Sequence, residues 1–346
     1  MASEVGCSRL PVVTILTRYA ASSLRLLDLW KSRLSHIPYK LLDHEKPEEA
    51  TADLQEAEIL LADPDLIGGY FSHLPEAKWV QGTWAGIDDL VDIVNPADLP
   101  PPFTFTRLGG GLTASMAEYV IAQMVAHERH FYEMKAAQEK KEWKWRNYRL
   151  MKHLTLGILG LGDIGEEIAR VCKAFGMRIW GLGRRDRSPE ERSKNVDEYR
   201  PLSGLAELLA DCDYICNVLP KTSATIDLLS GDVLSSCTKQ PVFINVGRGS
   251  VISEDSILNA LDKGWISHAI LDVFITEPLP PESKLWSSPK VTITPHYAAN
   301  TQPCAAGESP TAMVLPNAII DVMQENYKRY VNGEPLKYAV NWKLGY

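Results

Sequence analysis

The stretch LTLGILGLGDIGEEIARVCKA, from Leu154 to Ala174, decides the predicted fold of this chain. An apolar run of strand length enters a GxGxxG turn, and a helical pattern of apolar residues follows. The glycines of such a turn have separate tasks: Gly160 makes the tight bend, Gly162 lets the backbone approach a pyrophosphate, and Gly165 lets the helix lie close to the strand. Amides at the helix start face the negative charge of the ligand. An ordinary strand-to-helix turn is the alternative, and the flanking strand and helix make it the less favoured one. The predicted dinucleotide contacts of the turn are Gly160, Leu161, Gly162, Asp163, Ile164 and Gly165.

The end of the next predicted strand, residues 177–182, indicates which dinucleotide is bound. Gly183 follows this strand, about 20 residues beyond the glycine turn, and enzymes that bind NAD place Asp or Glu there. This chain continues with Arg184 and Arg185, whose guanidinium groups suit a 2′-phosphate. NADP(H) is therefore favoured, while Asp186 keeps NAD(H) possible. A solvated basic loop is the alternative.

Length and composition predict an ordinary globular protein. A chain of 346 residues with 45% hydrophobic residues is long enough for two domains, each with a buried core. The net charge of −8 argues against binding to nucleic acid or an anionic membrane. Six scattered cysteines without CxxC spacing predict buried free thiols and a reducing compartment. With no apolar window of transmembrane length and no targeting signal, the cytoplasm is the expected location.

The first hundred residues alternate short apolar strands with helical stretches, which predicts a parallel sheet. Strands are expected at residues 12–16, 58–62 and 78–81, and a loop with two glycines, Gly82 to Asp88, follows the last of them. A triple proline and a triple glycine bracket a short strand-like piece at 103–107, so the domain boundary is placed there. The predicted domains are a substrate domain of residues 1–107 and 299–346 and a dinucleotide-binding domain of residues 108–298.

A long helical pattern runs from Thr113 towards Trp143. Its later half is charged and contains Trp143 and Trp145, a mixture that nucleic-acid-binding segments share. A solvated helix, or one that packs on a second subunit, is the preferred interpretation. His127 and His130 would be one helical turn apart, but no third ligand is apparent, so exposed histidines and no metal are expected.

The β/α alternation becomes regular after Leu154. Strands are predicted at residues 154–159, 177–182, 213–218, 242–246, 268–272 and 291–294. Six parallel strands with intervening helices form a doubly wound sheet, whose ligands gather outside the carboxyl ends of the strands. The predicted fold class is α/β, with two doubly wound, Rossmann-like domains and a cleft between them. A last helix at residues 315–331 is expected to pack on the first domain. Predicted cofactor contacts in this half are Leu219, Pro220, Thr225, Val246, Gly247, Arg248, Asp272 and His296.

Three residues near these strand ends suit acid–base chemistry on a carboxylic acid. Arg248 stands between glycines in NVGRGS, and its planar fork matches a carboxylate. His296 follows an apolar strand and can change protonation near neutral pH. Glu277, in DVFITEPLP, is the natural carboxylate to orient the histidine. Each alone would be a surface charge or a satisfied interior group, but together they predict a catalytic trio.

The same residues carry a resemblance to the D-isomer-specific 2-hydroxyacid dehydrogenase family, and in particular to its NADPH-dependent glyoxylate/hydroxypyruvate and 2-ketoacid reductases. It extends over nearly the whole chain through WVQGTWAGID, MAEY, GILGLGDIG, NVGRGS, LDVFITEPLP and TPHYAANT. It implies a mechanism by Arg, Glu and His, a first domain completed by the C-terminal helix, and a homodimer joined through the long helix. The chain departs from the family's pattern at Trp84, where other members carry smaller groups, and in Cys304 to Thr311.

The resemblance implies hydride transfer from the nicotinamide to C2 of a 2-keto acid, with His296 donating a proton to the ketone oxygen. Arg248 is expected to clamp the carboxylate, together with the amides of Ala85 and Gly86, while domain closure excludes water. Asp272 is expected to position the carboxamide. The predicted substrate contacts are Trp84, Ala85, Gly86, Arg248 and His296.

Other members of this fold remain as alternatives. Transcriptional corepressors share the fold as nucleotide-sensing binding proteins, but they resemble NAD-binding members, and the paired arginines weigh against them. Formate dehydrogenases carry Gln where Glu277 stands, and phosphoglycerate dehydrogenases are longer because they add a regulatory domain.

Overall fold

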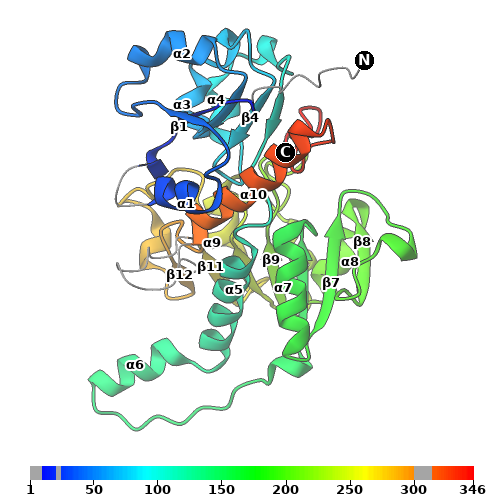
Figure 1. Ribbon diagram of the computed structural model, residues 1–346. Coiled ribbons are helices and arrows are strands. Elements are labelled where there is room, and N and C mark those ends of the chain that lie inside the picture. Colours follow the sequence, from blue (N-terminus) through cyan, green and yellow to red (C-terminus); the bar gives the residue numbers. More distant parts are fainter. Residues whose placement is uncertain (1–9, 21–24, 300–313) are drawn as a thin grey trace, which may run out of the picture. The chain divides into compact units, whose positions relative to one another are not determined.

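The computed structural model describes residues 10–20, 25–299 and 314–346 (Figure 1). The chain divides into two compact units, Met1–Leu112 with Thr301–Tyr346, and Thr113–Asn300. The described residues of each unit contain one sheet whose strands are all parallel and alternate with helices along the chain. This architecture confirms the predicted α/β fold class with two Rossmann-like sheets.

The first unit has, within its described residues, a five-stranded sheet in the order β2-β1-β3-β4-β5. Its strands are β1 (Val13–Leu16), β2 (Tyr39–Leu41), β3 (Ile59–Ala62), β4 (Trp79–Gly82) and β5 (Thr104–Thr106). Its helices are α1 (Leu26–Arg33), α2 (Thr51–Gln55), α3 (Pro64–Gly68), α4 (Asp88–Ile93) and α10 (Val314–Val331). Successive strand residues enter opposite cores, so α1 and α10 cover one face of the sheet and α2 to α4 the other.

The second unit has a seven-stranded sheet among the described residues, in the order β12-β11-β10-β9-β6-β7-β8. Its strands are β6 (Thr155–Leu159), β7 (Arg178–Gly183), β8 (Glu198–Pro201), β9 (Tyr214–Asn217), β10 (Val242–Asn245), β11 (His268–Leu271) and β12 (Val291–Ile293). Its helices are α5 (Thr113–Glu128), α6 (Phe131–Glu139), α7 (Asp163–Ala174), α8 (Leu205–Asp211) and α9 (Glu254–Asp262). The strand order reverses between β6 and β9, which is the switch point where ligands of such sheets bind.

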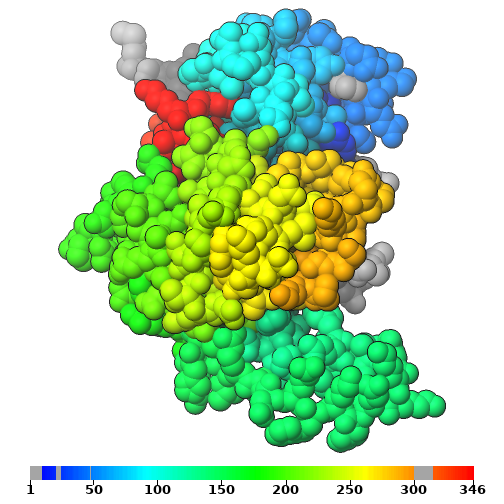
Figure 2. Space-filling model, turned by 180° about the vertical axis from the view of Figure 1, so that it is seen from behind, coloured from blue at the N-terminus to red at the C-terminus, as the bar shows by residue number. Residues whose placement is uncertain are grey.

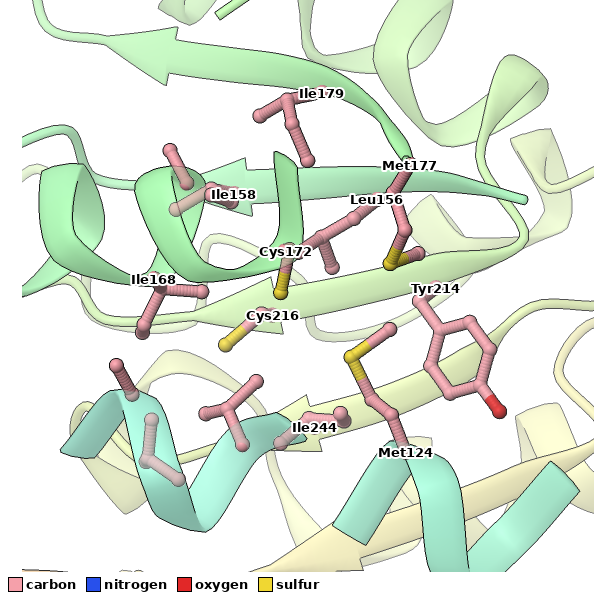
Figure 3. Packing of buried hydrophobic residues seen from close by; sticks show 14 of the residues in the cluster. Met124, Leu156, Ile158, Ile168, Cys172, Met177, Ile179, Tyr214, Cys216 and Ile244 are labelled. Carbon is pink, nitrogen blue, oxygen red and sulfur yellow. The ribbon is translucent and has the colours of Figure 1, made fainter. Parts of the chain in front are cut away.

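Two apolar clusters hold this second sheet between its helices. Helices α5 and α7 share one cluster, and Figure 3 shows Met124 of α5, Cys172 of α7 and Cys216 of β9 directed into it. Helices α8 and α9 pack in the cluster on the opposite face. Cys172, Cys212, Cys216 and Cys237 are free and buried, while Cys7 and Cys304 lie outside the described residues. None of the described helices combines the length and apolar character that crossing a membrane requires.

Two strands at sheet edges were missing from the sequence prediction, so the six strands expected for the second sheet are corrected to seven among the described residues. In β8, reading EYRP, only Tyr199 is buried, and β2, reading YKL, has no buried residue. An edge strand packs on fewer neighbours than a central one, so it needs no continuous apolar run. Hydrophobic periodicity therefore gives no signal for it.

The single long helix predicted from Thr113 towards Trp143 is wrong. Helix α5 ends at Glu128 and α6 begins at Phe131, because His130 between them has a left-handed backbone with φ 55°. Helix α6 ends at Glu139, and the chain to residue 150 is not helical. Residues 131–150, called the arm below, project away from the second sheet in Figures 1 and 2.

Candidate functional site

The glycines of the GxGxxG turn lie in three different environments. Gly160 has φ 106°, a conformation that side chains rarely adopt. A Cβ on Gly165 would lie 2.0 Å from the carbonyl oxygen of Gly160, so only glycine permits this close packing of α7 on the turn. A Cβ on Gly162, which directly precedes α7, would meet nothing within 4 Å, so no other part of the protein fills this position. The turn therefore fits a pyrophosphate at the helix N-terminus.

The other predicted residues of the turn support it from beneath or form the start of the helix. Leu161 is buried and packs under β7, where a Cβ on Gly181 would lie 2.2 Å from its side chain. Asp163 is exposed as the first residue of α7, and Ile164 packs against the core.

The arginines after β7 differ in their contacts. Arg184 is exposed, and Arg185 forms an ion pair with Glu191 at 2.8 Å. Arg187, which the sequence prediction did not single out, donates from Nη2 to the carbonyl oxygen of Leu161 in the glycine turn at 3.0 Å. It also lies over the ring of Tyr199 at 5.3 Å. Arg187 is therefore the arginine whose guanidinium group contacts the glycine turn. In the sequence, its positive charge was the available indication of such a role.

A pair of fully buried asparagines organises the loops after β9 and β10. Asn217 Nδ2 donates to Asn245 Oδ1 at 2.9 Å, and each side chain accepts a backbone N–H from its own loop, Leu219 for Asn217 and Gly247 for Asn245. Asn245 Nδ2 also donates to the carbonyl oxygen of Arg248 at 3.1 Å. The pair holds two of the predicted cofactor-contact segments together. The sequence indicated this pair through the position of each asparagine, a polar residue at the end of an apolar strand.

Two other residues predicted to contact the cofactor, Thr225 and Val246, form hydrogen bonds that shape these loops. Thr225 Oγ1 donates to the carbonyl oxygen of Pro220 at 2.6 Å, which closes the loop after β9. Val246 is buried and its N–H bonds to the carbonyl oxygen of Asn217.

The glycines beside Arg248 allow its loop to contact both neighbouring loops. A Cβ on Gly247 would lie 2.8 Å from the carbonyl oxygen of Leu219. A Cβ on Gly249 would lie 2.0 Å from the backbone of Phe274, in the loop that carries Glu277. Half-buried Arg248 therefore stands between the loop after β9 and the loop after β11.

His296 and Glu277 form the central contact of the site. The distance between His296 Nδ1 and Glu277 Oε2 is 2.7 Å, and Glu277 Oε1 accepts the N–H of Phe274 at 2.8 Å. The hydrogen bond that His296 donates to Glu277 raises the pKa of His296, while burial and Arg248 act in the opposite direction. The pKa of Glu277 is lowered: burial raises it, but bonds from His296 and Phe274 and the charge of Arg248 outweigh that effect. The structure thus brings Arg248, Glu277 and His296 together as one electrostatic group.

Asp272 lies beneath this group at the end of β11 and is 1% exposed. Its carboxyl oxygens accept bonds from the hydroxyl of Thr294 and from the N–H groups of Tyr297 and Ala298. Its contact with a carboxamide stays a prediction.

The predicted substrate loop belongs to the other compact unit. Trp84, Ala85 and Gly86 follow β4 and are half-buried. The carbonyl oxygen of Trp84 accepts the N–H of Leu108 at 2.8 Å. The loop is further held by Thr83, whose hydroxyl donates to buried Asp63 at 2.6 Å.

The two histidines of the predicted long helix have different partners. Both are half-buried rather than exposed, and His130 lies between α5 and α6 rather than in a helix. The ring of His127 is 4.9 Å from that of His268, and burial lowers the pKa of His127. His130 Nε2 lies 3.2 Å from the carbonyl oxygen of Asn147. Within the part of the chain that the structure describes, no three His, Cys, Asp or Glu side chains are grouped to hold a metal ion.

Comparison with known proteins identifies similar chains. The family model "D-isomer specific 2-hydroxyacid dehydrogenase, NAD binding domain" matches residues 121–298. Glyoxylate/hydroxypyruvate reductase A from Serratia proteamaculans is 33% identical over 261 residues, which cover 71% of this chain and 80% of that protein.

Two solved structures extend the similarity over nearly the whole chain. One is an NADPH-dependent glyoxylate/hydroxypyruvate reductase from Sinorhizobium meliloti in complex with NADP and sulfate, with TM-score 0.78 and 27% identity. The match covers 97% of this chain and 100% of that one. The other is a D-isomer specific 2-hydroxyacid dehydrogenase from Xanthobacter autotrophicus Py2 in complex with NADPH and MES, with TM-score 0.80 and 26% identity. That match covers 98% of this chain and 100% of the other.

Proposed function

Because this chain belongs to the D-isomer specific 2-hydroxyacid dehydrogenase family, we propose that it is a reductase that converts small 2-keto acids into D-2-hydroxy acids with NADP(H). The observation that carries the proposal is the 2.7 Å contact between His296 and Glu277 beside Arg248. His296 then serves as a proton donor and Arg248 as a clamp for the substrate carboxylate, and reduction of a 2-keto acid requires both functions.

The roles of the trio follow from its contacts. NADPH, when bound, supplies the hydride that C2 of the substrate receives. His296 has its Nδ1 directed to Glu277, so Nε2 is the ring nitrogen that remains to donate a proton to the ketone oxygen. Glu277 keeps the imidazole protonated and in one orientation. Arg248 presents the planar fork that binds the substrate carboxylate.

The two units divide the work in this proposal. The predicted dinucleotide-binding domain, residues 108–298, corresponds to the unit Thr113–Asn300 and contains the glycine turn and the trio. The predicted substrate domain, residues 1–107 and 299–346, corresponds to the other unit and contains the loop Trp84–Gly86. Glyoxylate and hydroxypyruvate are the proposed substrates, supported by the relatives named for them.

NADP(H) is the proposed cofactor because the end of β7 offers arginines and Gly183 rather than a carboxylate. Arg184 is exposed, and Arg187 contacts the glycine turn and lies 3.7 Å from Glu166, so Arg187 is added to Arg184 and Arg185 as part of the proposed 2′-phosphate site. Arg185 is engaged by Glu191. The NADP- and NADPH-bound relatives support the same choice.

The test is steady-state kinetics of the purified protein with glyoxylate, hydroxypyruvate and bulkier 2-keto acids, each with NADPH and NADH. NADPH with the two small acids is expected to give the highest kcat/KM, and the His296→Asn variant to lose about 100-fold or more. A protein that binds NADPH but turns over none of these acids would be a nucleotide-sensing binding protein instead.

We also propose a homodimer formed through α5 and the arm. The arm exposes an unusual number of large apolar side chains, and such patches mark protein interfaces. Their exposed fractions include 99% for Trp143, 81% for Trp145 and 53% for Phe131. Sedimentation of the Trp143→Ser/Trp145→Ser variant is expected to show monomers. The matched control is Trp286→Ser, which alters an exposed tryptophan outside the arm and should leave the dimer intact.

The cytoplasm is the proposed compartment, since the four described cysteines are free thiols. Localisation of a fluorescent fusion tests this assignment.

A further inference from the structure

A chain of hydrogen bonds connects the middle of α5 with the loop that carries His296. The hydroxyl oxygens of Tyr119 and Thr294 are 2.6 Å apart, and Thr294 Oγ1 donates to Asp272 Oδ1 at 2.5 Å. A threonine hydroxyl has only one hydrogen, and Thr294 donates it in the hydrogen bond to Asp272. Tyr119 must therefore donate to Thr294, so the chain runs in one direction from Tyr119 through Thr294 to Asp272.

Asp272 is the point around which residues 294–298 are folded. Its Oδ1 also accepts the N–H of Tyr297, and its Oδ2 accepts the N–H of Ala298, both at 3.0 Å. Its carbonyl oxygen accepts the N–H of His296 at 2.8 Å. Thr294, His296, Tyr297 and Ala298 thus all donate to one buried residue, and the position of the loop depends on where the Asp272 carboxyl group points.

His296 needs such support because its backbone is unfavourable. Its φ of 49° lies in the left-handed region, which residues other than glycine seldom occupy. Residues in that region persist only when surrounding bonds determine their conformation. In this loop those bonds come from Asp272, on both sides of the histidine.

We propose that Tyr119 and Thr294 are positioning residues that orient Asp272 and thereby hold His296 against Glu277. The inference rests on the proposed function of His296 as proton donor. Tyr119 lies in α5 and is 9% exposed, and Thr294 follows directly after β12. Neither residue is assigned a contact with substrate or cofactor, so both act only through Asp272.

The expected kinetic effect is on turnover rather than binding. Without the Thr294 hydroxyl, Asp272 Oδ1 keeps only the N–H of Tyr297, and the loop can move. A small displacement of a catalytic group lowers the rate by about 10- to 100-fold. The charged groups that face His296 are Glu277, Arg248 and Asp272. Because displacement weakens the contact with Glu277, the pH at which reduction declines should also fall.

The experiment compares four single variants and the Tyr119→Phe/Thr294→Val double variant of the full-length protein. Thr294→Val removes the hydroxyl with little change of shape, and Thr294→Ser restores it. Tyr119→Phe removes only the phenol oxygen. Thr292→Val is the matched control, because Thr292 lies in β12 two residues before Thr294, and its hydroxyl takes no part in this series of hydrogen bonds but contacts His268 at 2.9 Å. Measurements are kcat, KM, the pH profile of reduction and an NMR titration of the His296 ring.

The hydrogen bonds from Tyr119 through Thr294 to Asp272, called the relay below, predict a specific pattern of kinetic effects. Thr294→Val should lose about 10- to 100-fold in kcat with KM changed less than about threefold, and its falling pH limb should move down. Thr294→Ser and Thr292→Val should stay within about threefold of the wild type. As a single variant, Tyr119→Phe should lower kcat. In the Thr294→Val background the same substitution should have no further effect, because the two residues act in series.

Three results would overturn the relay: an unchanged kcat in Thr294→Val, an equal loss in Thr292→Val, or additive effects of the Tyr119 and Thr294 variants. If Thr294→Val does not fold, Tyr119→Phe decides, and its unchanged kcat would refute the relay. If the wild type reduces no keto acid, the proposed function is wrong. The NMR titration then still tests whether Tyr119→Phe lowers the pKa of His296, and an unchanged pKa would refute the relay.

Discussion

Replacing Glu277 by Gln removes the negative charge beside His296 and keeps a side chain of the same size. His296 Nδ1 and Glu277 Oε2 are 2.7 Å apart, and this bond raises the pKa of the imidazole. Two unit charges about 4 Å apart attract by about 1 kcal/mol in water and by about 4 kcal/mol at an effective dielectric constant of about 20. The side chains are 53% and 33% exposed, so water screens the pair and the low end of this range applies. The loss corresponds to about one pKa unit.

Reduction requires the protonated ring, so kcat/KM falls as the pH rises through the pKa that His296 has in the enzyme without bound substrate. In Glu277→Gln the falling limb should move about one unit to lower pH. Oxidation of the hydroxy acid requires the neutral ring, so its rising limb should move in the same direction. The assay is the pH profile of kcat/KM in both directions, with Glu282→Gln, on the same loop and exposed, as the control. Superimposable profiles of wild type and Glu277→Gln would refute the view that Glu277 tunes His296.

Further predictions concern carboxylate binding, cofactor choice and acid stability. Arg248→Lys should lose most of kcat/KM, because an ammonium group cannot form the planar two-bond contact with a carboxylate, and near-normal kinetics would place the carboxylate elsewhere. Arg184→Ala/Arg187→Ala should raise KM for NADPH far more than for NADH, since charge-assisted bonds contribute about 1.5–3 kcal/mol, and equal losses for the two cofactors would contradict this assignment. Burial lowers the pKa of His268 to about 4, so the folded protein keeps this ring neutral and loses stability as the pH falls from about 6.5 towards 4. His268→Gln, which can keep a bond to Thr292, should therefore unfold in urea with a pH dependence smaller by about 2 kcal/mol between pH 7 and pH 5, and an identical pH dependence would count against burial of the ring.

Interior strands and the glycine turn were predictable because their signals are local. A central parallel strand is buried on both faces, so its own residues form an apolar run, as in β6, β9 and β10. The bend at Gly160 and the close packing at Gly165 exclude side chains, so the glycines themselves mark the turn. Strand-end positions then indicated Arg248 and His296, because parallel strands bring their carboxyl ends to one edge.

Features that depend on packing between distant segments were not predictable. The arginine that contacts the glycine turn is set by the path of the chain after β7, which turns Arg187 towards Leu161 and pairs Arg185 with Glu191. The break at His130 contradicts a continuous helical pattern.

The amino-acid sequence by itself determined the two parallel sheets and the dinucleotide turn and singled out the residues of the proposed trio, because each prediction depends on residue types within one short segment. Only the tertiary structure decided that Asp272 receives bonds from Thr294, Tyr297 and Ala298, and that Tyr119 joins them from α5. Hydrogen bonds act over about 3 Å, whereas Tyr119 and Thr294 are 175 residues apart in the chain. Which donor meets which acceptor at that separation is fixed by how helices and strands pack, and no local pattern records it.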